Sequence, residues 1–305
     1  MSIEALHGPD AGAVILMRWQ RMGAPTWGVA TLAYGGWISL TLGYHALPWW
    51  VVLPAAGYVM ALYGSLQHET IHGHPTRWPL VNAALAWAPL WLWLPYPIYR
   101  DEHRTHHDDE ILTDPVADPE SKYAAPAEWP RLGRLRRAAL RFNTTLLGRL
   151  TLGPALAITD FLRREARAVI AGEPGRRRVW ALHALALLPV VAWLWVCAIP
   201  LWAYVLFFVY PGLSLTLLRS FAEHIASADP QSRTVTVEAG SLFSLLFLNN
   251  NLHALHHARP ELPWYVLRRL ARELPRPALR YGGYGEVARR FLLRPVHPPV
   301  HPLAG

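Results

Sequence analysis

The stretch "WWVVLPAAGYVMALYGSLQHETIH" (residues 49–72) decides the fold, because an apolar run leads directly into a pair of histidines. Residues 49–67 contain no charged side chain, and about 20 helical residues are needed to cross a bilayer. His68 and His72 follow four positions apart, so they share one face of a helix. The stretch therefore predicts a membrane-spanning helix that presents two imidazoles at its end.

The low charge content also indicates an integral membrane protein. Only 16% of the 305 residues are charged, against roughly 25% in soluble domains. Short uncharged connections at Pro48 and Pro200 join apolar segments into two helical hairpins with tight outer turns. Besides 49–67, the uncharged segments near the spanning length are 27–47, 79–98, 179–200 and 201–218.

The distribution of arginine and lysine predicts the topology. These residues avoid both outer turns and gather between Arg100 and Arg178 and from Arg219 onward. Since cytoplasmic loops collect positive charge, both termini, including segment 1–26, and the central region are expected in the cytoplasm. The overall net charge of +8 would also suit nucleic-acid binding, but no basic–aromatic motif accompanies it.

Segment 79–98 is the exception among the apolar segments. If it crossed the membrane once, "HETIH" (68–72) and "HRTHH" (103–107) would face opposite sides. We therefore expect it to lie at the interface or to dip in and return, and we expect 143–161 to lie on the membrane. The alternative is that 79–98 spans and the histidine groups are unrelated. The prediction is an all-α integral membrane protein with four transmembrane helices in two hairpins, interfacial helices and a cytoplasmic helical cap.

The chain is expected to form one membrane domain over residues 1–305, with the proline-rich end 295–305 as a loose tail. The apolar stretch 11–17 is too short and lacks the cleavage pattern of a signal peptide. The single cysteine, Cys197, excludes disulfides and cysteine-ligated iron–sulfur clusters within this chain.

Nine histidines form the candidate metal centre. A single HxxxH pair is weak evidence, but two HxxHH groups, all predicted on one side of the membrane, are not explained by scattered surface histidines. Nine imidazoles are too many for one metal and about right for two, and imidazole suits Zn, Cu, Fe and Ni. The predicted ligands are His68, His72, His103, His106, His107, His224, His253, His256 and His257.

Five further side chains are candidates to orient these imidazoles through the second ring nitrogen. Glu69 and Glu223 each adjoin a predicted ligand near the membrane. Asn249, Asn250 and Asn251 precede the third histidine group, where one could hold a ring N–H or a metal-bound water. The alternative for the three asparagines is capping of the helix that carries this group.

The order HxxxH, HxxHH, lone His, HxxHH resembles the membrane fatty acid desaturase and hydroxylase superfamily. "QHETIHGHPT" is similar to its first histidine box, "RDEHRTHHDDEILTDPVADPES" to its second and "NLHALHHARPELPWY" to its third. The resemblance implies four spanning helices and a cytoplasmic cap that holds a di-iron centre on the nine histidines. The three-residue gap in the first box departs from the acyl-CoA enzymes, and Ser220 stands where those enzymes have an asparagine.

The resemblance implies O2-dependent oxidation of an unactivated lipid C–H bond by two ferrous ions. Desaturation of a fatty acyl chain is favoured, and hydroxylation or ketolation of a lipid, alkane or carotenoid is the alternative. A histidine-rich metal transporter or sensor is the reading that involves no enzyme. Electrons would come from a separate ferredoxin or flavin reductase system, the substrate from the membrane, and the expected location is a bacterial inner membrane.

Overall fold

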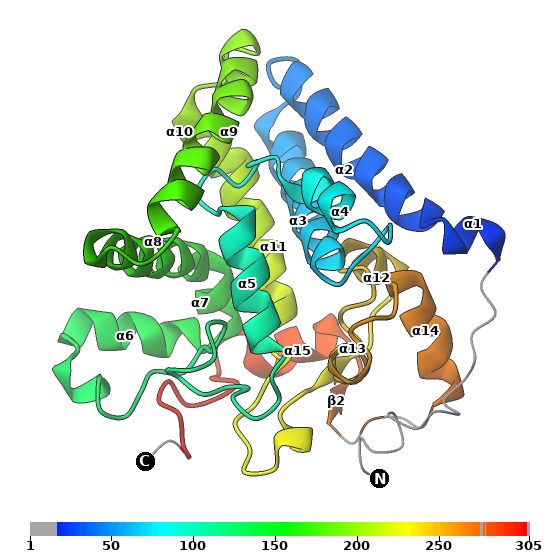
Figure 1. The fold of residues 1–305 in the computed structure, drawn as a ribbon. Coiled ribbons are helices and arrows are strands. Elements are labelled where there is room, and N and C mark those ends of the chain that lie inside the picture. The colour runs from blue at the N-terminus through cyan, green and yellow to red at the C-terminus, as the bar shows by residue number, and fades with distance from the viewer. Residues whose placement is uncertain (1–16, 275–276, 278, 304–305) are drawn as a thin grey trace. The chain divides into compact units, whose positions relative to one another are not determined.

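The computed structural model describes residues 17–274, 277 and 279–303, and these are mostly helical (Figure 1). They divide into two compact units. Unit 1 contains the described residues of 17–22, 102–152 and 217–303, and unit 2 contains residues 23–101 and 153–216. That the whole chain acts as one desaturase-like domain stays a prediction.

Unit 2 contains the apolar helices. Its elements are α2 (Ala24–Leu42), α3 (Trp49–Ile71), α4 (Pro79–Ala86), the start of α5 (Tyr96–His106), α8 (Gly153–Ala171), α9 (Arg176–Val196), α10 (Leu201–Tyr204), the π-helical turn η3 (Val205–Val209) and most of α11 (Tyr210–Ser220). Three helices among the described residues are long and apolar enough to cross a membrane: α3, α9 and the continuous helix Leu201–Ser220.

The expected fourth crossing falls on α2, which is not among these three helices. α2 has 19 residues, about 1.5 Å of rise each, so its length is close to the hydrocarbon thickness of a bilayer. Its composition is the reason that it falls short, because glycine and threonine take the place of larger apolar residues along much of its length. The prediction of four crossings is therefore supported for three helices and stays a prediction for α2.

The two hairpin turns lie where the prolines predict them. α3 begins at Trp49 directly after Pro48, and α10 begins at Leu201 directly after Pro200. Proline suits this position because its fixed φ and missing N–H cost nothing just before a helix. Within unit 2, α3 and α11 approach closely at Gly212, where an added Cβ would lie 2.4 Å from the Met60 Cβ. A larger side chain at this position would force the two helices apart.

Segment 79–98 does not form a spanning helix. α4 ends after 8 residues at Ala86, and the chain stays irregular until α5 begins at Tyr96. Irregular backbone can exist at membrane depth only where protein groups satisfy its carbonyls. Side chains of other unit 2 helices do so here: Gln67 Nε2 donates to Ala86 O (2.9 Å), Tyr204 Oη to Leu90 O (2.8 Å) and His183 Nε2 to Leu92 O (2.8 Å).

Unit 1 contains mainly short helices and the strands β1 and β2. Its elements are α1 (Arg18–Arg21), the end of α5, η2 (Trp129–Arg131), α6 (Arg134–Asn143), α7 (Leu146–Thr151), the end of α11, η4 (Pro230–Ser232), β1 (Thr236–Val237), α12 (Ser241–Leu246), α13 (His253–Ala258), α14 (Trp264–Glu273), β2 (Arg280–Tyr281) and α15 (Tyr284–Phe291). β1 pairs in parallel with β2, Thr236 opposite Arg280. α13 packs on α14 through Leu255, Leu267 and Leu270.

The described part of the expected loose tail, residues 295–303, makes backbone hydrogen bonds to other segments of unit 1, and its looseness stays a prediction. Val296 N donates to Thr144 O (2.9 Å), and Ala124 N donates to Pro299 O (2.8 Å). His301 N donates in turn to Ala124 O (3.1 Å). Proline removes backbone donors but leaves carbonyls free to accept, so a proline-rich segment can still be held by hydrogen bonds. We call residues 292–301 the C-terminal strap.

Candidate metal centre

The second histidine box lies at the end of α5, where the helical spacing brings its three rings together. His103 and His106 are 1% and 2% exposed. His103 Nε2 lies 3.1 Å from His107 Nε2, one helical turn later. The ring planes of this pair are nearly perpendicular, so the two nitrogens meet without stacking of the rings.

Backbone pairing around β1 joins the lone histidine to the third box within unit 1. Val235 N donates to Glu223 O (2.7 Å), which holds the chain that carries His224 beside β1. Val237 N donates to Asn251 O (2.9 Å), which holds the chain before α13 beside the same strand. The result is that His224 Nε2 lies 2.9 Å from His253 Nε2, although the two residues are 29 positions apart.

A strained turn leads into the third box. Leu248 and Asn249 both have positive φ angles, 48° and 57°, and a positive φ is uncommon for a residue other than glycine. Asn249 Nδ2 donates to Trp264 O (2.9 Å), which ties this turn to the start of α14. The turn and its tie position the six-residue helix α13, which carries all three histidines of the box.

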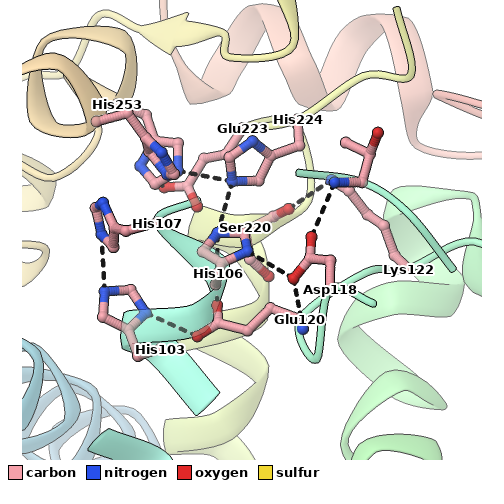
Figure 2. A network of polar contacts seen from close by, with 12 residues as sticks. His103, His106, His107, Asp118, Glu120, Lys122, Ser220, Glu223, His224 and His253 are labelled. Atoms are coloured by element: carbon pink, nitrogen blue, oxygen red, sulfur yellow. Dashed lines mark hydrogen bonds and ion pairs between the residues drawn. The ribbon is translucent and has the colours of Figure 1, made fainter. Parts of the chain in front are cut away.

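Four imidazoles of unit 1 converge as one group. The ligand atoms of His106, His224, His253 and His257 lie within 4.8 Å of one another, and all four residues are buried. His106 Nε2 lies 3.0 Å from His224 Nε2 (Figure 2). Two nitrogens that each lie about 2.1 Å from the same metal ion are about 3.0 Å apart when the nitrogen–metal–nitrogen angle is about 90°. The donor set and its spacing therefore fit a single transition-metal ion.

A second group in unit 1 consists of His103, His107 and His256. His256 Nε2 lies 3.2 Å from His107 Nε2, and the ligand atoms of the three residues lie within 4.8 Å of one another. His68 and His72, the remaining predicted ligands, end α3 in unit 2 with ring centroids 4.7 Å apart. Their part in this group stays a prediction.

Carboxylates hold the outer nitrogens of the second box. His106 Nδ1 lies 2.8 Å from Asp118 Oδ1, and His103 Nδ1 lies 2.7 Å from Glu120 Oε1 (Figure 2). The Asp118 carboxylate also accepts from Thr113 N (2.9 Å) and Glu120 N (2.9 Å), so the loop after the box fixes it. A hydrogen bond at Nδ1 leaves Nε2 as the metal-binding nitrogen and sets the orientation of the ring.

Asp118 and Glu120 were missed by sequence reasoning. The predicted orienting acids adjoin histidines in the sequence, whereas these two lie 12 and 14 positions beyond His106. The signal that could have found them is the "DPE" at 118–120, because a proline turn between two acids can direct both toward the preceding helix.

The five predicted orienting residues lie in different settings. Asn250 Oδ1 lies 3.1 Å from His253 Nδ1, and Glu223 Oε1 lies 3.6 Å from the same nitrogen. Asn249 and Asn251 instead donate to the backbone carbonyls of Trp264 and Val237. Glu69 is buried near the end of α3. α13 follows Leu252 and has no side-chain cap, so capping does not explain the asparagines.

Burial favours the neutral form of His224, His253 and His257, which is the form that binds a metal. Burial and neighbouring imidazoles hold the pKa of His224 and His253 well below the ordinary value. Burial lowers the pKa of His257 to about 4. His106 is the opposite case: burial opposes its charge, but Glu120 and Asp118 outweigh burial and raise its pKa. Glu120 itself is desolvated, yet His106 and His103 hold its pKa well below the ordinary value.

These shifts predict how the metal-free protein responds to acid. Burial places the pKa of His257 near 4 in the folded chain, whereas the unfolded value is about 6.5. Below pH 6.5 the unfolded chain binds the proton first, so stability falls between pH 6.5 and 4, on the order of 3 kcal/mol from His257 alone. Thermal unfolding of metal-free protein from pH 7.5 to 4.5 measures this. His257→Gln is expected to flatten the dependence; an unchanged slope in that variant contradicts the assignment.

Comparison with known proteins agrees with this geometry. The family model described as Fatty acid desaturase matches residues 45–287, which is most of the chain and includes all nine predicted ligands. No curated protein matches the chain. The resemblance predicted from the histidine spacing is confirmed at the level of the family.

Proposed function

The chain belongs to the fatty acid desaturase family, and from this premise we propose that it is a membrane di-iron oxidoreductase that desaturates a fatty acyl chain. Membership of this family implies an oxidoreductase of lipids, which disfavours the transporter or sensor reading. The observation that carries the proposal is the convergence of four buried histidines from three separate parts of the sequence. Four buried imidazoles whose ligand atoms lie this close together suit a bound metal ion and not a set of solvated surface side chains.

We propose iron as the metal and two ions as its number. Oxidation of an unactivated methylene needs a redox-active ion, which excludes zinc among the metals that imidazole prefers. When bound, the iron pair would supply the oxidising chemistry with O2. The proposed ligands of one ion are His106, His224, His253 and His257, and those of the other are His68, His72, His103, His107 and His256.

The protein's own residues would orient the metals and shield them from water. Asp118, Glu120 and Asn250 contact Nδ1 of His106, His103 and His253, so Nε2 is the nitrogen of each ring that would bind a metal. Desaturation removes two hydrogens from neighbouring carbons, and O2 with two electrons and two protons leaves as two waters.

The electrons must come from a separate protein. The chain's single cysteine cannot hold an iron–sulfur cluster, so a separate ferredoxin or flavin reductase system would supply them.

Hydroxylation or ketolation of a lipid, alkane or carotenoid is the second candidate. The observation that favours it is the spacing in the first histidine box, where three residues separate His68 from His72. This spacing resembles that of hydroxylases and ketolases as well as that of acyl-lipid desaturases. We propose for either reaction the same setting: a bacterial inner membrane, four crossings, and the histidine cap and both termini in the cytoplasm. Two observations support this setting. Three helices are long and apolar enough to cross a membrane, and basic residues are absent from both outer turns.

The products decide between the two reactions. The chain would be expressed in a bacterial host together with a ferredoxin and its reductase, and total lipids would be analysed by mass spectrometry. Desaturation appears as the loss of two hydrogens from an acyl chain, and hydroxylation as the gain of one oxygen. The control is His253→Ala, which should yield neither product. An oxygen-bearing product without any new alkene rejects the desaturase proposal, and no iron in the purified protein rejects the di-iron centre.

A further inference from the structure

Unit 1 contains a buried arginine that the metal centre does not use. Arg149 of α7 is 8% exposed, and the Nε atom of its guanidinium is buried without a hydrogen-bond partner among the residues that the structure describes. Burial lowers the pKa of Arg149 to about 10, so the group stays charged at neutral pH. A buried charge without a partner is costly, and native proteins usually pair it or bind a counterion.

Other nitrogen-bearing groups lie close to Arg149. The C-terminal strap passes along α7, since Leu147 N donates to Leu292 O (3.0 Å) and Val296 N to Thr144 O (2.9 Å). The strap thereby brings in His297, which is 6% exposed. His297 Nδ1 donates to Pro298 O (2.8 Å), and its Nε2 has no hydrogen-bond partner among the described residues.

The third member of the cluster is Lys122, which lies in the loop after the second histidine box. Lys122 precedes Tyr123, whose ring centroid lies 4.6 Å from that of His297. The Lys122 ammonium donates to the carbonyls of Ser220 (2.7 Å) and Phe221 (2.9 Å), which accounts for two of its three N–H donors. Burial and then the charges of Lys122 and Arg149 lower the pKa of His297 to about 3, as expected where cations are close together.

From this cluster we propose that Arg149 and Lys122 form a binding site, beside the His297 ring, for a small oxyanion, a carboxylate or a phosphate group. A planar guanidinium binds such a group through two parallel hydrogen bonds. Burial and the charge of Arg149 lower the pKa of Lys122 to about 7, and a bound anion favours its charged form, whose third N–H is a further donor. The nearest carboxylates to Lys122, Asp118 and Glu223, face the histidines His106 and His253, so neither neutralises Arg149. The inference does not depend on which lipid reaction the metal centre performs.

The anion is either a soluble ion or the headgroup of a lipid, and one experiment distinguishes these two sources. Thermal unfolding of the iron-loaded protein in uncharged detergent would be followed with inorganic phosphate or with chloride at equal ionic strength. A second arm would compare nanodiscs of phosphatidylcholine with and without phosphatidylglycerol. A bound anion should raise the Tm of the wild type by about 3 °C near saturation. A response to phosphate indicates a soluble anion, and a response to phosphatidylglycerol alone indicates a lipid headgroup.

Variants make the test specific. Arg149→Met should lose the shift in both arms, and in chloride its Tm should equal or exceed that of the wild type, since a buried unpaired charge is removed. Arg134→Met, on the exposed side of α6, is the matched control and should keep the full shift. If Arg149→Met does not fold, Lys122→Met, which removes the second donor of the proposed site, should reduce the shift. Equal shifts in the wild type and these variants in both arms would overturn the proposal.

Discussion

His253→Ala is expected to remove one of two bound iron ions and to abolish lipid oxidation, with activity falling by at least about 100-fold. His253 is 1% exposed, and its Nε2 lies 2.9 Å from Nε2 of His224, another member of the four-histidine group. Loss of a residue that merely orients a ligand usually costs 10- to 100-fold in metal affinity or activity, so loss of the ligand itself should cost more. Iron per chain by elemental analysis and product yield by mass spectrometry measure the two effects.

The control for this variant is His45→Ala, which also removes one imidazole but at the exposed turn between α2 and α3. The His45→Ala substitution should leave both the iron content and the product yield unchanged. The His253→Ala protein should keep its helical circular dichroism, because α13 is held on α14 by leucines rather than by the histidines. Full iron content with normal activity in His253→Ala would show that the group is not a metal site.

The part of the architecture that could be predicted from sequence is the part that depends on local spacing. The HxxHH pattern places three rings on adjoining faces of one short helix whatever surrounds it, and α5 and α13 follow this rule. The proline-marked turns at Pro48 and Pro200 are equally local, because proline fixes its own φ and leaves the following helix free to start.

What could not be predicted depends on contacts between distant segments. Asp118 reaches His106 only because the loop after the second box folds back, with Thr113 N and Glu120 N both donating to its carboxylate. The C-terminal strap forms hydrogen bonds with backbone groups of Thr144 and Ala124, which lie far away in sequence. Composition describes such a segment as proline-rich and loose, since it contains no information about which backbone groups will be near it.

Asp118→Asn is expected to lower the affinity of the four-histidine group for metal by about 10- to 100-fold while the fold is retained. The Asp118 side chain is 1% exposed and its two oxygens accept from three N–H groups, those of His106 Nδ1, Thr113 and Glu120. An asparagine has the same shape but only one oxygen, so its NH2 group must face a donor. The His106 ring then loses its fixed orientation or the loop loses its anchor. Competition titrations with a chelator of known affinity measure the change.

Asp114→Asn separates these two causes, because Asp114 anchors the same loop without touching a histidine. Its Oδ1 accepts from Val116 N and Ala117 N, both at 2.8 Å. If ring orientation is what Asp118 contributes, Asp114→Asn lowers the Tm slightly and leaves metal affinity within about twofold of the wild type. An equal loss of affinity in both variants would instead mean that the loop as a whole supports the site. If ring orientation is the cause, the hydrogen bond that His106 Nδ1 donates to the buried Asp118 carboxylate is what makes His106 a ligand rather than a buried base.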